Sequence, residues 1–429
     1  MDAGGKIVMP GFVNTHTHSY YGIMARGILT EITLFLEQGL AGYMTAMSAE
    51  KSTINTSMHV LEGIKRGTTT FCDNGTYTNH VAKVYEQCGV RARLSESIRE
   101  MSWDYRDQLG EVYTFDRKYA GDSFAVMHEL LDKYGTDPND RISAMVSFQA
   151  LDFVSEETVI EIRELAKKRN AMIHTHLAQS RFEIEQVEKR YGVRPVEAFE
   201  RLGLLNGNTL AAHLVYNLPE ENKKAAESGL KMAYCPYTFG RKGLTPPAAQ
   251  FVHYGGTVGI GSDEACYTCV NPISDMKSAH VSANVDAVLH DLPKVPLYRL
   301  LRMHTVEAAQ AIGLGAQTGS LEPGKKADVI LLGLHAVNMQ PVLISPLTNI
   351  PQNIIVAATG TEVETVLVDG KTIMENGVVK TMDENKIIGD LQKLGQEAME
   401  TARAYYEKLP SSEVLDIQNK LKQIKDEGR

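Results

Sequence analysis

The sequence predicts an α/β protein built on a (β/α)8 TIM barrel, with a small β-sandwich portion and a helical C-terminal tail. Three observations lead to this prediction. Eight short β-rich runs alternate with amphipathic helical patterns over about 10–315, a turn-rich β pattern follows over 316–380, and helical spacing returns from 381. The competing fold, an open doubly wound sheet, would require a glycine-rich nucleotide fingerprint that the chain lacks.

The barrel prediction rests on the alternation of strands and helices in chain order. The predicted strands are 11–18, 67–74, 90–97, 141–149, 170–178, 208–216, 230–238 and 256–264. Amphipathic stretches such as "ETVIEIRELAKKRN" lie between them. Parallel strands joined by helical crossovers close into a barrel when eight units follow one another. We therefore expect residues 10–315 to form a metal-dependent barrel domain.

Two further segments complete the chain. Residues 316–380 contain Pro-Gly, Asp-Gly and Asn-Gly pairs between apolar runs, which predicts a small all-β unit that we expect to pair with residues 1–9. Residues 381–429 carry apolar side chains at spacings of three and four, in two stretches separated by Pro410. We expect this tail to pack on the barrel or on a partner subunit.

Composition excludes several classes of protein. The chain has 429 residues, 43% hydrophobic and 23% charged, with a modest net charge of -9. Without a concentrated basic surface, neither nucleic acid nor an anionic membrane is an expected partner. The longest apolar runs are too short to span a membrane, and the five cysteines are irregularly spaced. These features predict a cytoplasmic protein.

Histidines and an aspartate lie at the carboxyl ends of predicted strands, where barrel enzymes place their sites. They are His16, His18, His174, His176, His213 and Asp263. Residues i and i+2 of a strand point to the same face, so His16 and His18 can reach one metal ion together. A lone strand histidine is more often a core residue, but the whole set on strand ends favours a metal site. Neutral imidazoles and a carboxylate suit Zn²⁺, and also Fe²⁺.

A metal ion held in this way would activate water at neutral pH. Asp263 can accept the proton of that water while it contacts the metal. His213 can orient the water or polarise the group under attack. These residue types in this arrangement predict hydrolysis.

With these residues in view, the chain resembles the amidohydrolase superfamily, in its branch of nucleobase-type and S-adenosylhomocysteine-type deaminases and triazine (chloro)hydrolases. The resemblance covers nearly the whole chain, through "PGFVNTHTH", "RGTTTFCD", "YGVRPVEAFERLGLLN", "AAHLVY", "GIGSDE" and "TGSLEPGKKADVILL" in order. It implies one divalent metal ion bound by His16, His18, His176 and Asp263. It also implies a homodimer, and an N-terminally truncated sandwich, because relatives carry strands before "PGF".

Three departures from the family pattern concern the substrate. Gln179 stands where family deaminases have a glutamate that transfers a proton to the substrate ring; an amide cannot titrate. The loop "CPYTFGRKGLTPP" differs from the family's longer one, and Glu264 follows the aspartate where glycine is usual. Glu264 is the nearest candidate for the missing acid. The residues expected to contact substrate are Gln179, His174, Glu264, Gln149 and Tyr237.

The leading hypothesis is a metal-dependent hydrolase that cleaves a carbon–nitrogen bond of a small heterocyclic substrate, an aminohydrolase with Asp263, His213 and Gln179 in the catalytic site. The alternative is hydrolysis of a cyclic amide, or dechlorination of a triazine-like ring, which needs less help from a carboxylic acid. A non-catalytic scaffold is the third reading. It is disfavoured because degenerate family members usually lose metal ligands first, and this chain keeps them.

Overall fold

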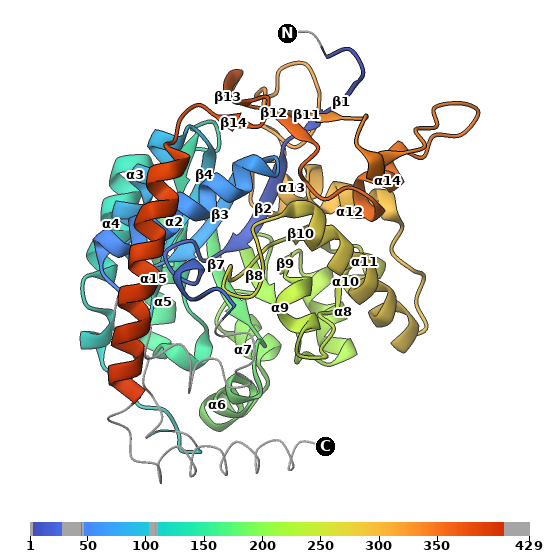
Figure 1. Ribbon diagram of the computed structural model, residues 1–429. Coiled ribbons are helices and arrows are strands. Elements are labelled where there is room, and N and C mark those ends of the chain that lie inside the picture. Colours follow the sequence, from blue (N-terminus) through green and yellow to red (C-terminus); the bar gives the residue numbers. More distant parts are fainter. Residues whose placement is uncertain (1–2, 28–43, 45–46, 103–107, 109, 407–429) are drawn as a thin grey trace.

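Eight parallel strands form a nearly closed barrel at the centre of the computed structural model, which describes residues 3–27, 44, 47–102, 108 and 110–406 (Figure 1). In chain order they are β2 (Phe12–Thr17), β3 (Thr68–Gly75), β4 (Arg91–Ile98), β6 (Val146–Phe148), β7 (Ile173–Leu177), β8 (Thr209–His213), β9 (Lys231–Tyr234) and β10 (Thr257–Ile260). Each strand lies beside the next one in this list, so the spatial order around the barrel is the same as the chain order. A parallel bridge between Thr17 and Asp263 connects the two end strands. The predicted barrel is confirmed.

The fourth predicted strand, 141–149, is split in two. β5 (Ile142–Ala144) pairs with the start of β4, and β6 pairs with its end. Met145 lies between them, and its N–H donates to the carbonyl of Leu94 at 2.8 Å. The interruption therefore keeps both halves on the same neighbouring strand.

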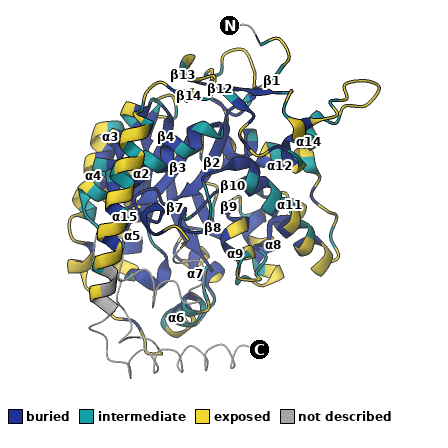
Figure 2. Cartoon of the chain, in the orientation of Figure 1, coloured by how far each residue is buried: buried dark blue, intermediate teal, exposed yellow. Residues whose placement is uncertain are grey.

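The helices cover the outside of the barrel, and Figure 2 shows buried strands inside a shell of partly exposed helices. They are α2 (Ala49–Lys65), α3 (Thr78–Cys88), α4 (Ser123–Tyr134), α5 (Glu156–Arg169), α6 (Arg181–Tyr191), α7 (Pro195–Arg201), α8 (Pro219–Glu227), α9 (Pro236–Gly240), α10 (Ala248–His253), α11 (Pro272–Leu289), α12 (Leu297–Met303) and α13 (Val306–Ala311). Short 3-10 turns are η1 (Ile23–Ala25), η5 (Arg117–Ala120) and η6 (Leu151–Phe153).

Local sequence explains where helix α5 begins and ends. The Ser155 hydroxyl accepts the N–H of Thr158, and Asn170 adopts a left-handed conformation after the last turn. Glutamates occupy the first turn and basic residues the last, which complements the helix dipole. Its buried apolar face then packs on the barrel.

An apolar cluster closes the barrel at the end opposite the predicted site. It combines strand residues with residues in and just after α13, and consists of Val13, Cys72, Met145, Met172, Leu210, Ala212, Ala233, Ala308, Ala309, Ala311, Ile312 and Leu314. Small alanines let the helix approach the strand ends closely. The predicted site residues lie at the other end, on the carboxyl ends of the strands.

The small unit is a five-stranded antiparallel sheet in the order β1 (Lys6–Pro10), β11 (Val329–Gly333), β12 (Val363–Val368), β13 (Lys371–Glu375) and β14 (Val378–Val379). The predicted Asp-Gly and Asn-Gly turns join its last three strands. Asp369 and Gly370 have φ of 50° and 76°, and Asn376 and Gly377 have 52° and 73°. Positive φ at both positions is what a tight hairpin turn requires.

We expected residues 316–380 to be all-β, and this was wrong for the segment between β11 and β12. That segment contains the 3-10 turn η7 (Val337–Met339) and helix α14 (Ile350–Val356). Ile354 and Ile355 are buried, and α14 packs against α11 and α12. The apolar residues of this stretch therefore pack against barrel helices and not against a neighbouring strand. The local sequence pattern does not reveal this tertiary contact.

The first part of the tail is helix α15 (Glu384–Tyr406), which lies along α2 and η1 (Figure 1). Leu394 and Ala398 are buried, and Lys65 pairs with Glu384 at 2.8 Å. The second predicted stretch, beyond Pro410, lies outside the described residues. Across the described helices, none combines the length and hydropathy needed to cross a membrane.

A buried ion pair joins the barrel to the small sheet. Arg91 on β4 contacts Asp328 through two hydrogen bonds, Nε to Oδ2 at 2.7 Å and a terminal guanidinium nitrogen to Oδ1 at 3.1 Å. Both side chains are at most 1% exposed. Asp328 Oδ1 also accepts the N–H of Asp369, in the β12–β13 turn, at 2.8 Å. The carboxylate therefore positions both units.

We expect Asp328→Ala to lower the free energy of unfolding by about 3–5 kcal/mol, because it leaves a buried guanidinium unpaired. Urea denaturation followed by circular dichroism measures the change. Glu364→Ala is the matched control: it removes a partly exposed partner of Lys6, for which we expect about 0–1 kcal/mol. Equal losses in the two variants would contradict this role of Asp328.

Candidate metal centre

The carboxyl ends of β2, β7 and β8 and the chain just after β10 bring the predicted histidines and aspartate together. His16, His18, His174, His176, His213 and Asp263 are each at most 6% exposed. The N–H of Asp263 donates to the carbonyl of His16 at 3.0 Å, so barrel closure itself places the carboxylate beside the first strand. His213 and Asp263 adopt positive φ, 86° and 58°. Such strain in non-glycine residues is typical of functional sites.

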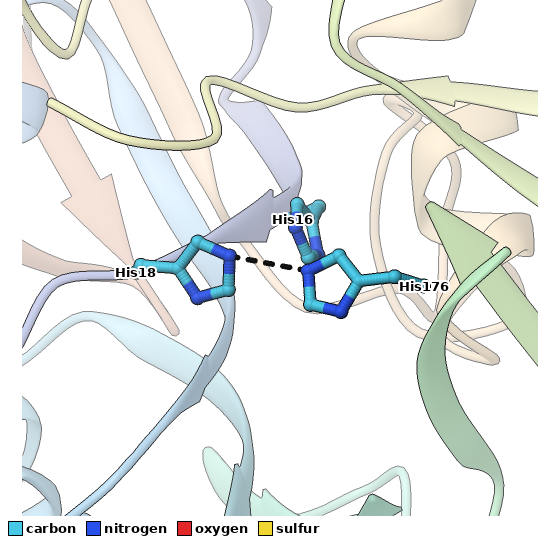
Figure 3. Close-up of side chains that lie close together, drawn as sticks. All are labelled: His16, His18 and His176. Carbon is cyan, nitrogen blue, oxygen red and sulfur yellow. Dashed lines mark hydrogen bonds between the residues drawn. The ribbon is translucent and has the colours of Figure 1, made fainter. Parts of the chain in front are cut away.

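Two ring nitrogens face each other without a proton to share. His18 Nδ1 lies 2.5 Å from the carbonyl oxygen of Asn74, and His176 Nδ1 lies 2.6 Å from that of Gln149. A carbonyl only accepts, so each Nδ1 carries the proton and each Nε2 of a neutral ring is bare. The two Nε2 atoms are nevertheless 3.3 Å apart (Figure 3). Two lone pairs at this separation repel, and a cation between them relieves that repulsion.

The remaining members complete a set of ligand atoms. His16 Nε2 is buried without a hydrogen-bond partner and lies 3.6 Å from Asp263 Oδ1, which is 3.5 Å from His18 Nε2. Ligand atoms lie within 4.8 Å of one another in the group His16, His18, His176 and in the group His16, His213, Asp263. Imidazole nitrogens and one carboxylate arranged in this way fit a divalent metal ion.

Burial sets the charge states that metal binding needs. It lowers the pKa of His16 and His176 well below the usual value, and neighbouring histidines lower both further. Burial also lowers the pKa of His213 to about 3. For Asp263, burial raises the pKa, but His213, His18 and His176 outweigh it, and the pKa lies below its usual value. At neutral pH His16, His176 and His213 are therefore neutral, and Asp263 is ionised.

Glu264 is half-buried beside this centre. The hydroxyl of Tyr21 donates to its Oε1. Burial, and then the charge of Asp263, raise the pKa of Glu264 to about 7. The structure therefore brings a second carboxyl group next to the predicted ligands. It belongs to Glu264, which stands where glycine is usual in the family.

The other predicted substrate residues lie in different surroundings. His174 is fully buried, with Nε2 2.8 Å from His16 Nδ1. Gln149 contributes its backbone carbonyl to His176, while its side chain accepts from Ser97 at 3.1 Å. Gln179 is half-buried in the turn after β7, and Tyr237 is 37% exposed at the start of α9.

Sequence reasoning missed two residues that shape this centre. Glu183 is buried and accepts the N–H groups of Ala178, at 3.0 Å, and Gln179, at 2.8 Å, which holds the turn that carries Gln179. The Ser180–Glu183 spacing, a helix-start signal, could have identified it. Phe239 packs its ring against His213, with centroids 4.8 Å apart. We find no sequence signal that predicts this contact.

Comparison with known proteins places the chain among hydrolases of one family. It is 30% identical to the 5-methylthioadenosine/S-adenosylhomocysteine deaminase of Desulforamulus reducens over 92% of this chain and 86% of that protein. It is also 30% identical to the 5'-deoxyadenosine deaminase of Methanobrevibacter smithii, over 94% and 89%.

Solved structures share the fold. An adenosine deaminase from Xanthomonas campestris with bound zinc superposes with a TM-score of 0.82 at 24% identity, over 92% of this chain and 86% of that one. The atrazine chlorohydrolase of Arthrobacter aurescens complexed with zinc gives 0.80 at 21%, over 91% and 88%. The predicted resemblance to deaminases and triazine hydrolases is confirmed.

The sequence profile described as "Amidohydrolase family" matches residues 7–373, which is most of the chain. Together with relatives at 30% identity over nine-tenths of the chain, this confirms that the protein is an enzyme. The chain belongs to the amidohydrolase family.

Proposed function

We propose that the protein is a deaminase that uses zinc as its metal ion. It removes the exocyclic amino group from the purine of an adenosine-type nucleoside by hydrolysis of the carbon–nitrogen bond. The observation that carries the proposal is the pair of bare Nε2 atoms on His18 and His176 beside Asp263, at the carboxyl ends of the barrel strands. Relatives named deaminases of 5-methylthioadenosine, S-adenosylhomocysteine and 5'-deoxyadenosine support the substrate class.

In this proposal His16, His18, His176 and Asp263 hold the metal ion. A zinc ion at such a site would lower the pKa of a bound water to about 7 and so supply hydroxide at neutral pH. Asp263, which is ionised at neutral pH because its pKa lies below the usual value, accepts the proton of the attacking water. The neutral ring of His213, whose buried Nδ1 has no hydrogen-bond partner, orients that water.

The reaction needs a group that protonates the ring nitrogen of the substrate, and Gln179 stands where family deaminases have that group. Water adds to the ring carbon, the adjacent ring nitrogen gains a proton, and the bond to the amino group breaks as ammonia leaves. Gln179 can donate a hydrogen bond to that ring nitrogen but cannot protonate it. The proton that Asp263 takes from water must therefore return to the substrate. Gln179, Glu264, Gln149 and Tyr237 remain predicted substrate contacts.

The zinc-loaded protein should release ammonia from 5-methylthioadenosine, S-adenosylhomocysteine, 5'-deoxyadenosine or adenosine, with the ultraviolet change of adenine to hypoxanthine. A chelator-treated sample and Asp263→Asn are the controls, and both should lose the activity. Chloride release from a chlorotriazine, measured in parallel, tests the alternative. Chloride without ammonia would favour the triazine reaction, and neither product from metal-loaded protein would refute hydrolysis of both classes.

We expect Gln179→Glu to raise kcat on the preferred nucleoside, by up to about 10²-fold, because it supplies a titrating group near the ring. Steady-state kinetics at matched zinc content measure the gain. Gln179→Met, similar in size but without polar groups, is the control and should not gain. An unchanged kcat in Gln179→Glu with zinc retained would show that the missing acid does not limit the reaction.

We also propose a homodimer, supported by apolar side chains exposed along one helix. Val281, Val285, Val288 and Leu289 of α11 are 41% to 68% exposed, and the first three follow helical spacing on one face. Light scattering should give twice the chain mass of 47.3 kDa. Val288→Asp should give the single mass, whereas Val112→Asp, in a loop, should not. A monomeric native protein would contradict the proposal.

A further inference from the structure

The three histidines at the metal centre differ in what holds their second ring nitrogen. His18 and His176 each donate Nδ1–H to a backbone carbonyl, a group that can only accept. His16 Nδ1 instead faces His174 Nε2 at 2.8 Å. An imidazole nitrogen can donate or accept, so the tautomer of His16 depends on the tautomer of His174.

The surroundings of His174 determine its tautomer. Its Nδ1 lies 3.4 Å from Ser95 Oγ and 3.6 Å from Cys72 Sγ. The Ser95 hydroxyl is 3.1 Å from the carbonyl oxygen of Asp73 and gives its only proton to that acceptor. The Cys72 thiol points its proton at the sulfur of Met145, 3.7 Å away. Both atoms therefore present lone pairs to His174 Nδ1, which must carry the ring proton.

These hydrogen bonds run in one direction, from His16 through His174 to Ser95 and the Asp73 carbonyl. With its proton on Nδ1, His174 has a bare Nε2 and accepts from His16 Nδ1–H. His16 Nε2 is then left bare, and it is the buried, unpartnered atom that faces Asp263. Every bond in the series has a donor and an acceptor only in this arrangement.

We infer that His174 is a positioning residue that fixes His16 in the Nδ1–H tautomer and so presents Nε2 to the metal ion. This role differs from the substrate contact predicted from the sequence, and it rests on the proposed metal ligation by His16. His16, His174, Ser95 and Cys72 are all 0% exposed, so water cannot take the place of the imidazole acceptor.

The test compares two substitutions at one position. His174→Leu removes the acceptor for His16 Nδ1–H, and we expect zinc affinity, measured by competition with a chromophoric chelator, to fall about 10- to 100-fold. His174→Gln keeps a side-chain oxygen that can accept, and it should restore most of the affinity. The visible spectrum of the Co²⁺ protein should change in His174→Leu and return toward wild type in His174→Gln.

A matched control separates this role from general packing. His304 is 1% exposed and donates to or accepts from no predicted metal ligand; its Nδ1 lies 3.0 Å from the carbonyl of Val13. His304→Leu should reduce thermal stability while leaving zinc affinity unchanged. Wild-type zinc affinity in folded His174→Leu, or equal losses in His174→Leu and His304→Leu, would overturn the inference.

A direct measurement covers the case in which His174→Leu does not fold. Nitrogen-15 NMR of the histidine rings in the zinc-loaded native protein should show both His16 and His174 protonated at Nδ1. A proton on Nε2 of His174 would overturn the inference without any variant. Neither readout uses substrate, so a protein that releases no ammonia would refute the proposed deaminase and leave this inference standing.

Discussion

The centre of this protein depends on keeping buried imidazoles neutral, with bare nitrogens directed at one point. Burial removes the charge from His16 and His176, and backbone carbonyls hold the Nδ1 protons of His18 and His176 on the side away from Asp263. The result is a concentration of lone pairs beside a carboxylate, which is unfavourable until a cation joins it. A bound cation is therefore expected to stabilise the folded chain.

The barrel supplies the geometry that this requirement needs. Parallel strands direct their carboxyl ends to one face, and the bond from Asp263 N–H to the His16 carbonyl closes the ring where the ligands meet. The apolar cluster around α13 fills the opposite end, and the Arg91–Asp328 pair fastens that end to the small sheet. These packed contacts around the barrel are what allows the strained φ values at His213 and Asp263 to persist.

Most of the fold was predictable because its signals are local. Eight β-rich runs, the turn pairs and the first part of the helical tail each depend on neighbouring residues, and these appear, with the strand at 141–149 interrupted at Met145. The helix Ile350–Val356 was not predicted as one, since its burial depends on α11 and α12 from an earlier part of the chain. The contact of Phe239 with His213 escaped for the same reason.

The sequence by itself determined the barrel, the family and the set of residues that meet at the carboxyl ends of its strands, because strand periodicity and chain order dictate which side chains share that face. Only the tertiary structure decided what each histidine does there. His174 and His176 are two residues apart on one strand, and only the family resemblance distinguishes them in the sequence. The ring of His176 reaches the facing nitrogen of His18, whereas that of His174 reaches His16 Nδ1, Ser95 and Cys72. Hydrogen-bond partners from other strands, which no local pattern encodes, separate the predicted metal ligand from the residue that we propose orients one.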